Sequence, residues 1–348
     1  MSAEVEIRVD GRAGIITLTR EKAINALNGA MIASISVALE DWEDDPGISM
    51  ILIEGRGEKG FCAGGDVRAV RQLVLEARPD AAQAYFEDEY RMNGLLATYQ
   101  KPIVALQHGF VMGGGIGLSS HARYRIATRS SRFAMPEAAI GFFSDVGVNA
   151  ILYQTPEHRA LAFMMSGTPV GPGDAIALGL SDAMIEDVEL AGLRQRLIEA
   201  ALSVEPDTAI GAIIAGETLE PEGTGFCDTA DSLRLAFENQ SASDILANLS
   251  SLADEGDPGA SALYQAMAGD CPTSLEVIVR AHRLSRRLRD VQEILALDTD
   301  LAKFMARRAD FAEGVRAVLV DKDRKPRWSP ADFEGLEHAA IDAAVAPH

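Results

Sequence analysis

Two acidic residues, Glu137 and Asp145, lie among apolar neighbours near the middle of the chain. Glu137 follows Met135-Pro136, and Asp145 follows Phe142-Phe143-Ser144. An unpaired carboxylate is costly to bury, and burial raises its pKa toward the range in which a general acid or base works at neutral pH. We therefore take Glu137 and Asp145 as candidate catalytic carboxylates.

Glycines at two strand-to-helix junctions form the second chemical feature. An apolar run at residues 103–106 indicates a buried strand, and the triplet Gly113-Gly114-Gly115 follows it. A similar turn, Phe61-Cys62-Ala63-Gly64-Gly65-Asp66, precedes a helix that begins at Val67. Bare N–H groups at a helix N-terminus favour negative charge, and small residues let a ligand approach the backbone. Two such junctions side by side can point two N–H groups at one oxygen, as an oxyanion hole requires.

Other chemistries have weaker signals in this sequence. The six histidines, among them His108 and His121 beside the glycine triplet, form no HExxH motif, so we expect no metal site. No Gly-x-Ser-x-Gly elbow is present, and no glycine pattern is followed by Lys-Ser or Lys-Thr, which excludes a P-loop. Cys62 lies beside the first glycine turn, but no partner base is evident, and we expect a small packed residue.

Composition limits the classes of partner and compartment. The formal net charge is -20, which argues against nucleic acid and anionic membranes as general partners. No apolar run reaches the ~18 residues of a membrane span. The three cysteines show no CxxC or zinc spacing and are typical of free thiols in a reducing compartment. The N-terminus has neither a signal-peptide nor a transit-peptide pattern, so we expect a cytoplasmic protein, and an organellar protein after removal of its transit peptide would have the same pattern.

Periodicity predicts an α/β core followed by a helical region. Residues 4–10 and 14–19 indicate a hairpin, 49–53 and 181–185 short strands, and 79–99 a helix. Asn28 is a suitable N-cap for a helix that extends to Trp42. Helical patterns dominate after residue 187, so we predict a catalytic core at 1–200 and a helical C-terminal region at 201–348.

Three charged segments have both an ordinary and a functional interpretation. Lys22, at the end of a predicted strand, is either solvated or a phosphate contact. Glu87, Asp88 and Glu89 most simply form the wet side of the helix at 79–99. The residues Arg280, His282, Arg283, Arg286, Arg287 and Arg289 stand out in an acidic chain, and a solvated helix face is the simplest account.

Taken together, these motifs resemble the signature of the crotonase (enoyl-CoA hydratase/isomerase) superfamily, and within it the 3-hydroxyisobutyryl-CoA hydrolase branch most. The resemblance extends over nearly the whole chain. Besides the two glycine junctions it rests on 23–28 (AINALN), on the Glu89-Tyr90 pair and on a terminal block at 311–323 (FAEGVRAVLVDKD). The pair and the terminal block favour the hydrolase branch.

The resemblance implies a crotonase-type spiral of β-β-α units with a helical C-terminal region. It implies that the N–H groups of Ala63 and Gly114 form the oxyanion hole. It further implies an acyl-CoA substrate, no cofactor beyond the CoA of that substrate, and a homo-oligomer, a trimer or paired trimers. Arg316 or Lys322 is a candidate for the CoA end of the ligand. The implied substrate-binding residues are Lys22, Gly64, Gly65, Asp66, Glu89, Gly114, Glu137 and Asp145.

The resemblance also separates hydrolysis from hydration. The hydratase branch uses two glutamates, one at the position of Glu137 and one at the position that is Gly117 here, whereas the hydrolase branch keeps the first and adds an Asp at the position of Asp145. The implied reaction is hydrolysis of 3-hydroxyisobutyryl-CoA in valine breakdown, with Glu137 as nucleophile or as base for a water. Hydratase or isomerase activity and non-catalytic binding of a CoA ester remain alternatives. One departure bears on acyl specificity: the usual FPDVGGG is FSDVGVN at 143–149.

Overall fold

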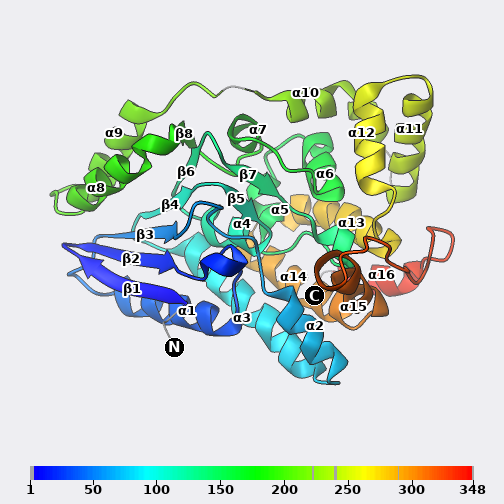
Figure 1. Ribbon diagram of the computed structural model, residues 1–348, viewed down its shortest axis with the longest axis horizontal. Coiled ribbons are helices and arrows are strands. Elements are labelled where there is room, and N and C mark those ends of the chain that lie inside the picture. Colours follow the sequence, from blue (N-terminus) through cyan, green and yellow to red (C-terminus); the bar gives the residue numbers. More distant parts are fainter. Residues whose placement is uncertain (1–3, 222, 239–240, 289, 347–348) are drawn as a thin grey trace. The chain divides into compact units, whose positions relative to one another are not determined.

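The computed structural model describes residues 4–221, 223–238, 241–288 and 290–346, and the chain forms two compact units (Figure 1). Unit 1 comprises the segments up to residue 65, 91–133 and 170–224, and unit 2 comprises 66–90, 134–169 and 225 onward. Because these segments alternate along the chain, neither unit coincides with the predicted core at 1–200 or the predicted region at 201–348. That division remains a prediction from secondary-structure content: the described residues after β8 (Ala183–Ile185) form helices and loops.

A six-stranded sheet organises unit 1. Its strand order is β1 (Val5–Asp10), β2 (Ala13–Leu18), β3 (Met50–Gly55), β4 (Ile103–Gln107), β6 (Tyr124–Thr128) and β8. The β1–β2 hairpin is antiparallel and every later pairing is parallel. Parallel strands need helices on their faces, which explains the continuous apolar runs. Accordingly α8 (Leu190–Ala200) and α9 (Pro206–Glu217) pack on one face through Leu193, Leu197 and Ile210.

Short elements complete unit 1 around the glycine junctions. β5 (Phe110–Met112) pairs with β7 (Arg132–Ala134), and α4 (Gly114–Ser119) follows β5. The remaining elements are η1 (Glu21–Ala23), α1 (Gly29–Glu43), α7 (Pro172–Ala177) and η3 (Asp187–Glu189). As predicted, Asn28 caps α1, and its side chain accepts from the Met31 N–H at 3.0 Å.

Unit 2 is helical and has an aromatic core. Phe86 stacks on Phe142 with ring centroids 4.9 Å apart, and Phe311 lies 5.5 Å from Phe142. These rings come from α3 (Pro79–Thr98), from the loop after η2 (Glu137–Ile140) and from α15 (Ala309–Val315). The other helices are α2 (Val67–Leu75), α5 (Val148–Leu152), α6 (Glu157–Ser166), α10 (Gly225–Ser232), η4 (Arg234–Phe237), α11 (Ala242–Asp254), α12 (Pro258–Met267), α13 (Pro272–Leu288), α14 (Val291–Ala306), η5 (Arg316–Val320) and α16 (His338–Val345).

Candidate active site

Four buried carboxyl groups gather in unit 2. Glu89 belongs to α3, Glu137 begins η2, Asp145 lies in the loop before α5, and Asp298 belongs to α14. Their relative exposures are 2%, 8%, 5% and 1%, and Asp145 interacts electrostatically with each of the other three. The two predicted catalytic carboxylates are therefore neighbours, with the predicted Glu89 beside them. The expectation that Glu89 belongs to the wet side of its helix is wrong, and Asp298 was not predicted.

Burial determines the protonation of this cluster. It raises the pKa of Asp145 to about 7, and the O–H of Tyr90 limits the rise. Burial and the charge of Asp145 raise the pKa of Glu89 to about 8. The same two causes raise the pKa values of Glu137 and Asp298 well above their ordinary range. Because like charges in one apolar site oppose further ionisation, the cluster retains protons at neutral pH.

Two hydrogen bonds fix the Asp145 loop. The Tyr90 hydroxyl donates to Asp145 Oδ2 at 2.6 Å, and the Gly147 N–H donates to Asp298 Oδ2 at 2.8 Å. Within the described part of the chain, Glu89 Oε1, Glu137 Oε2 and Asp298 Oδ1 are buried without a hydrogen-bond partner. Buried polar atoms normally have partners, so these oxygens provide open positions for a ligand or a water.

The loop also carries backbone strain. Val146 has φ of 55° and Gly147 has φ of 70°. A β-branched residue in the left-handed region is a conformational outlier, and such strain persists only where the surroundings enforce it. Ser144 and Asn149, which depart from the family pattern, are both buried here. Asn149 Oδ1 lies 2.9 Å from His282 Nδ1, and burial lowers the pKa of His282 to about 3, so this imidazole is neutral.

The terminal block packs directly on the element that carries Glu137. A Cβ on Gly314 would lie 2.4 Å from the Ile140 carbonyl carbon, and one on Gly141, whose φ is 71°, would lie 2.4 Å from the Asp310 carbonyl oxygen. Only glycine allows this approach of α15 to η2. The block at 311–323 therefore supports the position of Glu137 through backbone contact.

The two glycine junctions lie side by side within unit 1. The Cys62 N–H donates to the Phe110 carbonyl at 3.0 Å, and the Met112 N–H donates to the Cys62 carbonyl at 3.0 Å. A Cβ on Gly64 would lie 3.6 Å from the Gly114 amide nitrogen. Gly114 begins α4, so its N–H has no acceptor within the helix.

The predicted pair of free N–H donors is only partly present. The Ala63 N–H donates to the Ile24 carbonyl at 2.9 Å, so this implied oxyanion donor already has an acceptor in the structure. Asp66 is the N-cap of α2 and accepts from the Ala69 N–H at 3.2 Å. Lys22 is exposed on η1. Cys62 is buried and its thiol donates to the Asn25 carbonyl, as expected of a packed residue.

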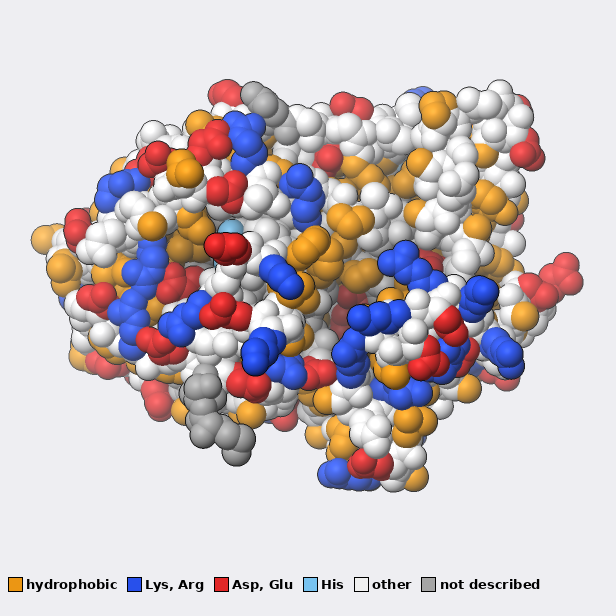
Figure 2. All heavy atoms as spheres, viewed as in Figure 1, with side chains coloured by type: hydrophobic (Ala, Val, Ile, Leu, Met, Phe, Trp, Pro, Cys, Tyr) orange, Lys and Arg blue, Asp and Glu red, His pale blue; other side chains and the backbone are white. Residues whose placement is uncertain are grey.

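Arg316, a candidate for the CoA end, is held by acidic neighbours. Its guanidinium pairs with Glu313 at 2.8 Å and with Asp321 and Asp323 at 2.7 Å each. Lys322, the other candidate, is exposed with φ of 59°. Acidic and basic side chains are interspersed on the face drawn in Figure 2, so the negative total does not exclude local basic groups.

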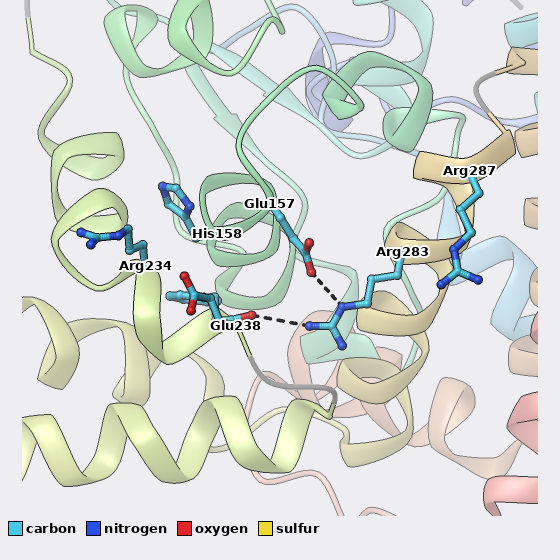
Figure 3. A pocket seen from close by; sticks show the side chains of 7 residues that line it. Glu157, His158, Arg234, Glu238, Arg283 and Arg287 are labelled. Atoms are coloured by element: carbon cyan, nitrogen blue, oxygen red, sulfur yellow. Dashed lines mark hydrogen bonds and ion pairs between the residues drawn. The ribbon is translucent and has the colours of Figure 1, made fainter.

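The prediction of a solvated face on α13 is wrong for most of its basic residues, and Arg287 is exposed as predicted. Arg286 donates to the Tyr153 and Thr155 carbonyls, and His282 is fully buried. Arg283 and Glu157 point toward each other in Figure 3, with 2.8 Å between Nε and Oε1. They line a pocket of about 660 Å³ together with His158, Arg234, Phe237, Glu238 and Arg287. Arg283 and Arg286 thus join α13 to neighbouring segments of unit 2, and Arg289 lies outside the described residues.

Across residues 4–346, apart from the gaps named above, His, Cys, Asp and Glu side chains form no group of three or more that could hold a metal ion. Over the same residues no helix has the length and apolar character needed to cross a membrane.

The chain belongs to the enoyl-CoA hydratase/isomerase family, because residues 13–345 match that family. The 3-hydroxyisobutyryl-CoA hydrolase, mitochondrial, of Gallus gallus is 35% identical over 349 residues, which cover 99% of this chain and 89% of that protein. The protein of the same name from Homo sapiens is 34% identical and covers 95% of this chain and 85% of its own length.

Solved structures of the same family share the fold. The crystal structure of a carnitinyl-CoA dehydratase from Mycobacterium thermoresistibile has a TM-score of 0.91 at 30% identity and covers 99% of this chain and 97% of its own. That of an enoyl-CoA hydratase from Rhodobacter sphaeroides 2.4.1 has a TM-score of 0.87 at 33% identity and covers 99% and 98%. The predicted α/β fold of the crotonase type is confirmed.

Proposed function

We propose that this chain is an acyl-CoA thioester hydrolase that converts 3-hydroxyisobutyryl-CoA and water to 3-hydroxyisobutyrate and free CoA. The observation that carries the proposal is the buried pair Glu137 and Asp145, both with raised pKa values, in a chain about 35% identical over its whole length to proteins named for this reaction. Such a reaction belongs to valine degradation.

In the proposed mechanism Glu137 acts on the thioester carbonyl carbon. Either its carboxylate attacks that carbon and a water later cleaves the mixed anhydride, or it removes a proton from the attacking water. In both routes the C–S bond breaks, and the departing thiolate takes a proton from a carboxyl group that holds its proton at neutral pH, for which Glu89 is our candidate. Asp145, in its ionised form, accepts a hydrogen bond from the 3-hydroxyl group of the substrate, with Glu89 beside it.

The proposed oxyanion hole comprises the N–H groups of Gly114 and Ala63. Each such donor contributes about 3 kcal/mol to transition-state stabilisation in comparable sites. For Ala63 this role requires the N–H to be shared with, or released from, the Ile24 carbonyl. Gly64, Gly65, Asp66 and Lys22 remain proposed contacts of the CoA ester.

Hydration of an enoyl-CoA is the second candidate function, and the names of the two solved structures favour it. Against it stands Gly117, a buried glycine of α4 at the position where hydratases carry their second glutamate. A third alternative is a binder of CoA esters without catalysis, for which four buried acids of high pKa would have no purpose.

The proposed enzyme has expected properties in its cofactor requirement, its compartment and its oligomeric state. It needs no cofactor or metal, since CoA is part of the substrate. We place it in the cytoplasm, although the hydrolases that it resembles are named mitochondrial. We also propose a trimer or paired trimers, which sedimentation equilibrium would test.

The decisive experiment follows free-thiol release from 3-hydroxyisobutyryl-CoA with a thiol reagent, for the wild type and for Glu137→Gln. Glu276→Gln is the matched control, because Glu276 is also a buried acid of unit 2 but is paired with Arg280. We expect rapid release by the wild type and the control and none by Glu137→Gln. Turnover of crotonyl-CoA alone would establish the hydratase, and binding of both esters without turnover would establish the binder.

A further inference from the structure

Asp298 is the member of the carboxyl cluster for which the proposed mechanism has no use. It comes from α14, 151 residues beyond the backbone group that it binds, and its side chain is 1% exposed. Its Oδ2 accepts from the Gly147 N–H, and its Oδ1 has no partner among the described residues. Burying an acidic side chain costs folding free energy, so the contacts of Asp298 should reveal a role that offsets this cost.

The geometry of the loop indicates that role. Asp145, Val146 and Gly147 are consecutive, so the N–H bound by Asp298 is two residues from the carboxylate bound by Tyr90. Between these two anchors Val146 is held at φ of 55°, which a valine adopts only under constraint. Without the second anchor the strained turn can relax, and the direction of the Asp145 carboxylate changes with it.

We propose that Asp298 is a positioning residue: its buried carboxyl oxygen accepts the Gly147 N–H and holds the Asp145–Gly147 turn in the conformation that directs Asp145 at the substrate. It acts through Asp145 and does not itself touch the reacting atoms. The inference rests on the proposed hydrolysis, because its readout is the turnover of the thioester.

The charge state of Asp298 makes this role specific. The groups that face it are Asp145 on its loop and Tyr90 on α3, and both interact with it electrostatically. Burial and the Asp145 charge favour the protonated form of Asp298. The Gly147 N–H is therefore bound by a neutral acceptor, and the amide oxygen of an asparagine can take the place of that carboxyl oxygen.

Three substitutions of Asp298 differ in whether they keep a hydrogen-bond acceptor for the Gly147 N–H. Asp298→Asn retains a neutral oxygen acceptor, so we expect kcat within about threefold of the wild type and an unchanged acid limb of the pH profile. Asp298→Ala and Asp298→Leu remove the acceptor, and we expect kcat to fall by about ten- to a hundredfold with KM changed less than threefold. A ten- to hundredfold fall in kcat corresponds to the loss of one or two hydrogen bonds that stabilise the transition state.

Glu276→Ala is the matched control for a purely structural role. Glu276 is also a buried acid, and its Oε2 accepts the Ala242 N–H at 2.9 Å in the same unit. We expect Glu276→Ala to lower the Tm of the protein while the kcat of the folded enzyme stays the same.

Two outcomes would overturn the inference. If Asp298→Ala and Asp298→Leu behave like the Glu276→Ala control, Asp298 is only structural. If Asp298→Asn loses as much kcat as Asp298→Leu, the negative charge matters and the acceptor account is wrong. If Asp298→Ala is not recovered folded, the Asn and Leu variants still decide. A wild type that releases no thiol refutes the proposed function instead, so the two failures are distinguishable.

Discussion

Replacing Tyr90 by phenylalanine isolates the side-chain hydrogen bond that stabilises the charge of Asp145. The Tyr90 O–H donates to Asp145 Oδ2 at 2.6 Å, and both side chains are buried. The ring itself lies 6.1 Å from the Phe86 ring, in apolar surroundings that a phenylalanine fills equally well. The substitution therefore removes a donor and leaves the packing in place.

The size of the effect follows from the loss of a charge-assisted bond. A hydrogen bond to an ionised group contributes about 1.5–3 kcal/mol. Since about 1.4 kcal/mol corresponds to one pH unit, the pKa of Asp145 should rise from about 7 by about one to two units. At pH 7 the ionised fraction then falls from about one half to between about 10% and 1%, so activity should drop about five- to fiftyfold.

The sign of the pH dependence is the critical part of this prediction. The O–H favours the ionised form of Asp145, so without it the acid limb of kcat/KM must move to higher pH. Thiol release from 3-hydroxyisobutyryl-CoA, measured between pH 5.5 and 9.5 with the uncatalysed rate subtracted, gives that limb. Most of the lost activity should return at about pH 9.5, where both enzymes are ionised.

Tyr99→Phe is the control, because the Tyr99 O–H donates to the Leu39 carbonyl at 2.6 Å in unit 1. Its pH profile should coincide with that of the wild type. A loss of activity in Tyr90→Phe that is uniform over all pH values, or an acid limb that moves to lower pH, would refute the assignment of this limb to Asp145.

Three further predictions concern the surroundings of the cluster. Glu89→Gln should make the protein more stable at pH 8 than the wild type but not at pH 4.5, as measured by urea unfolding. The folded state holds the Glu89 proton up to about pH 8, whereas the unfolded chain loses it near pH 4.5, so the wild-type free energy of unfolding falls by roughly 3 kcal/mol from pH 4.5 to 7. A variant whose free energy of unfolding changes with pH as steeply as that of the wild type would contradict this. Gly314→Ala should cost about 1–3 kcal/mol and lower kcat, because the new Cβ would displace Ile140 beside Glu137; unchanged thermal unfolding and turnover would disprove the close packing. Asn149→Ala should cost about 1–3 kcal/mol in thermal unfolding, because it leaves the His282 imidazole unpaired in the core; Ser144→Ala, whose bond to Met164 is 3.4 Å long, should cost less.

Much of the fold could be predicted because its signals are local. The Asn28 cap, the hairpin at residues 4–19 and the apolar runs of β3 and β4 depend on neighbours within a few positions, and all appear where the sequence places them. Glu137 and Asp145 were also recognisable, because acids within apolar segments are unusual at the level of the sequence itself.

The residues that were missed depend on partners far away in the chain. Asp298 lies in a stretch, Leu297-Asp298-Thr299-Asp300, that is typical of an ordinary helix surface, and only its bond to Gly147, 151 positions away, gives it a role. Glu89 follows two acids, and its neighbours alone indicate a solvated position, so it was the resemblance to the hydrolase branch that predicted it at the substrate site. The occupation of the Ala63 N–H by Ile24 is a backbone bond, which no pattern of side chains reveals.

The protonation of the cluster suits the leaving group of a thioester. A free thiol has a pKa of about 8.5, so a departing thiolate is best protonated by an acid of similar pKa that still holds its proton at neutral pH. An exposed carboxyl group, with a pKa near 4, has lost its proton at pH 7 and cannot serve. Glu89, with a pKa of about 8, meets this requirement, whereas Asp145 at about 7 is half ionised at neutral pH; desolvation is the first cause of both values. The aromatic core includes Phe86, from the same helix as Glu89, and Phe142, three residues before Asp145, so we infer that the packing that holds unit 2 together also adjusts its acids to the chemistry of a thiol.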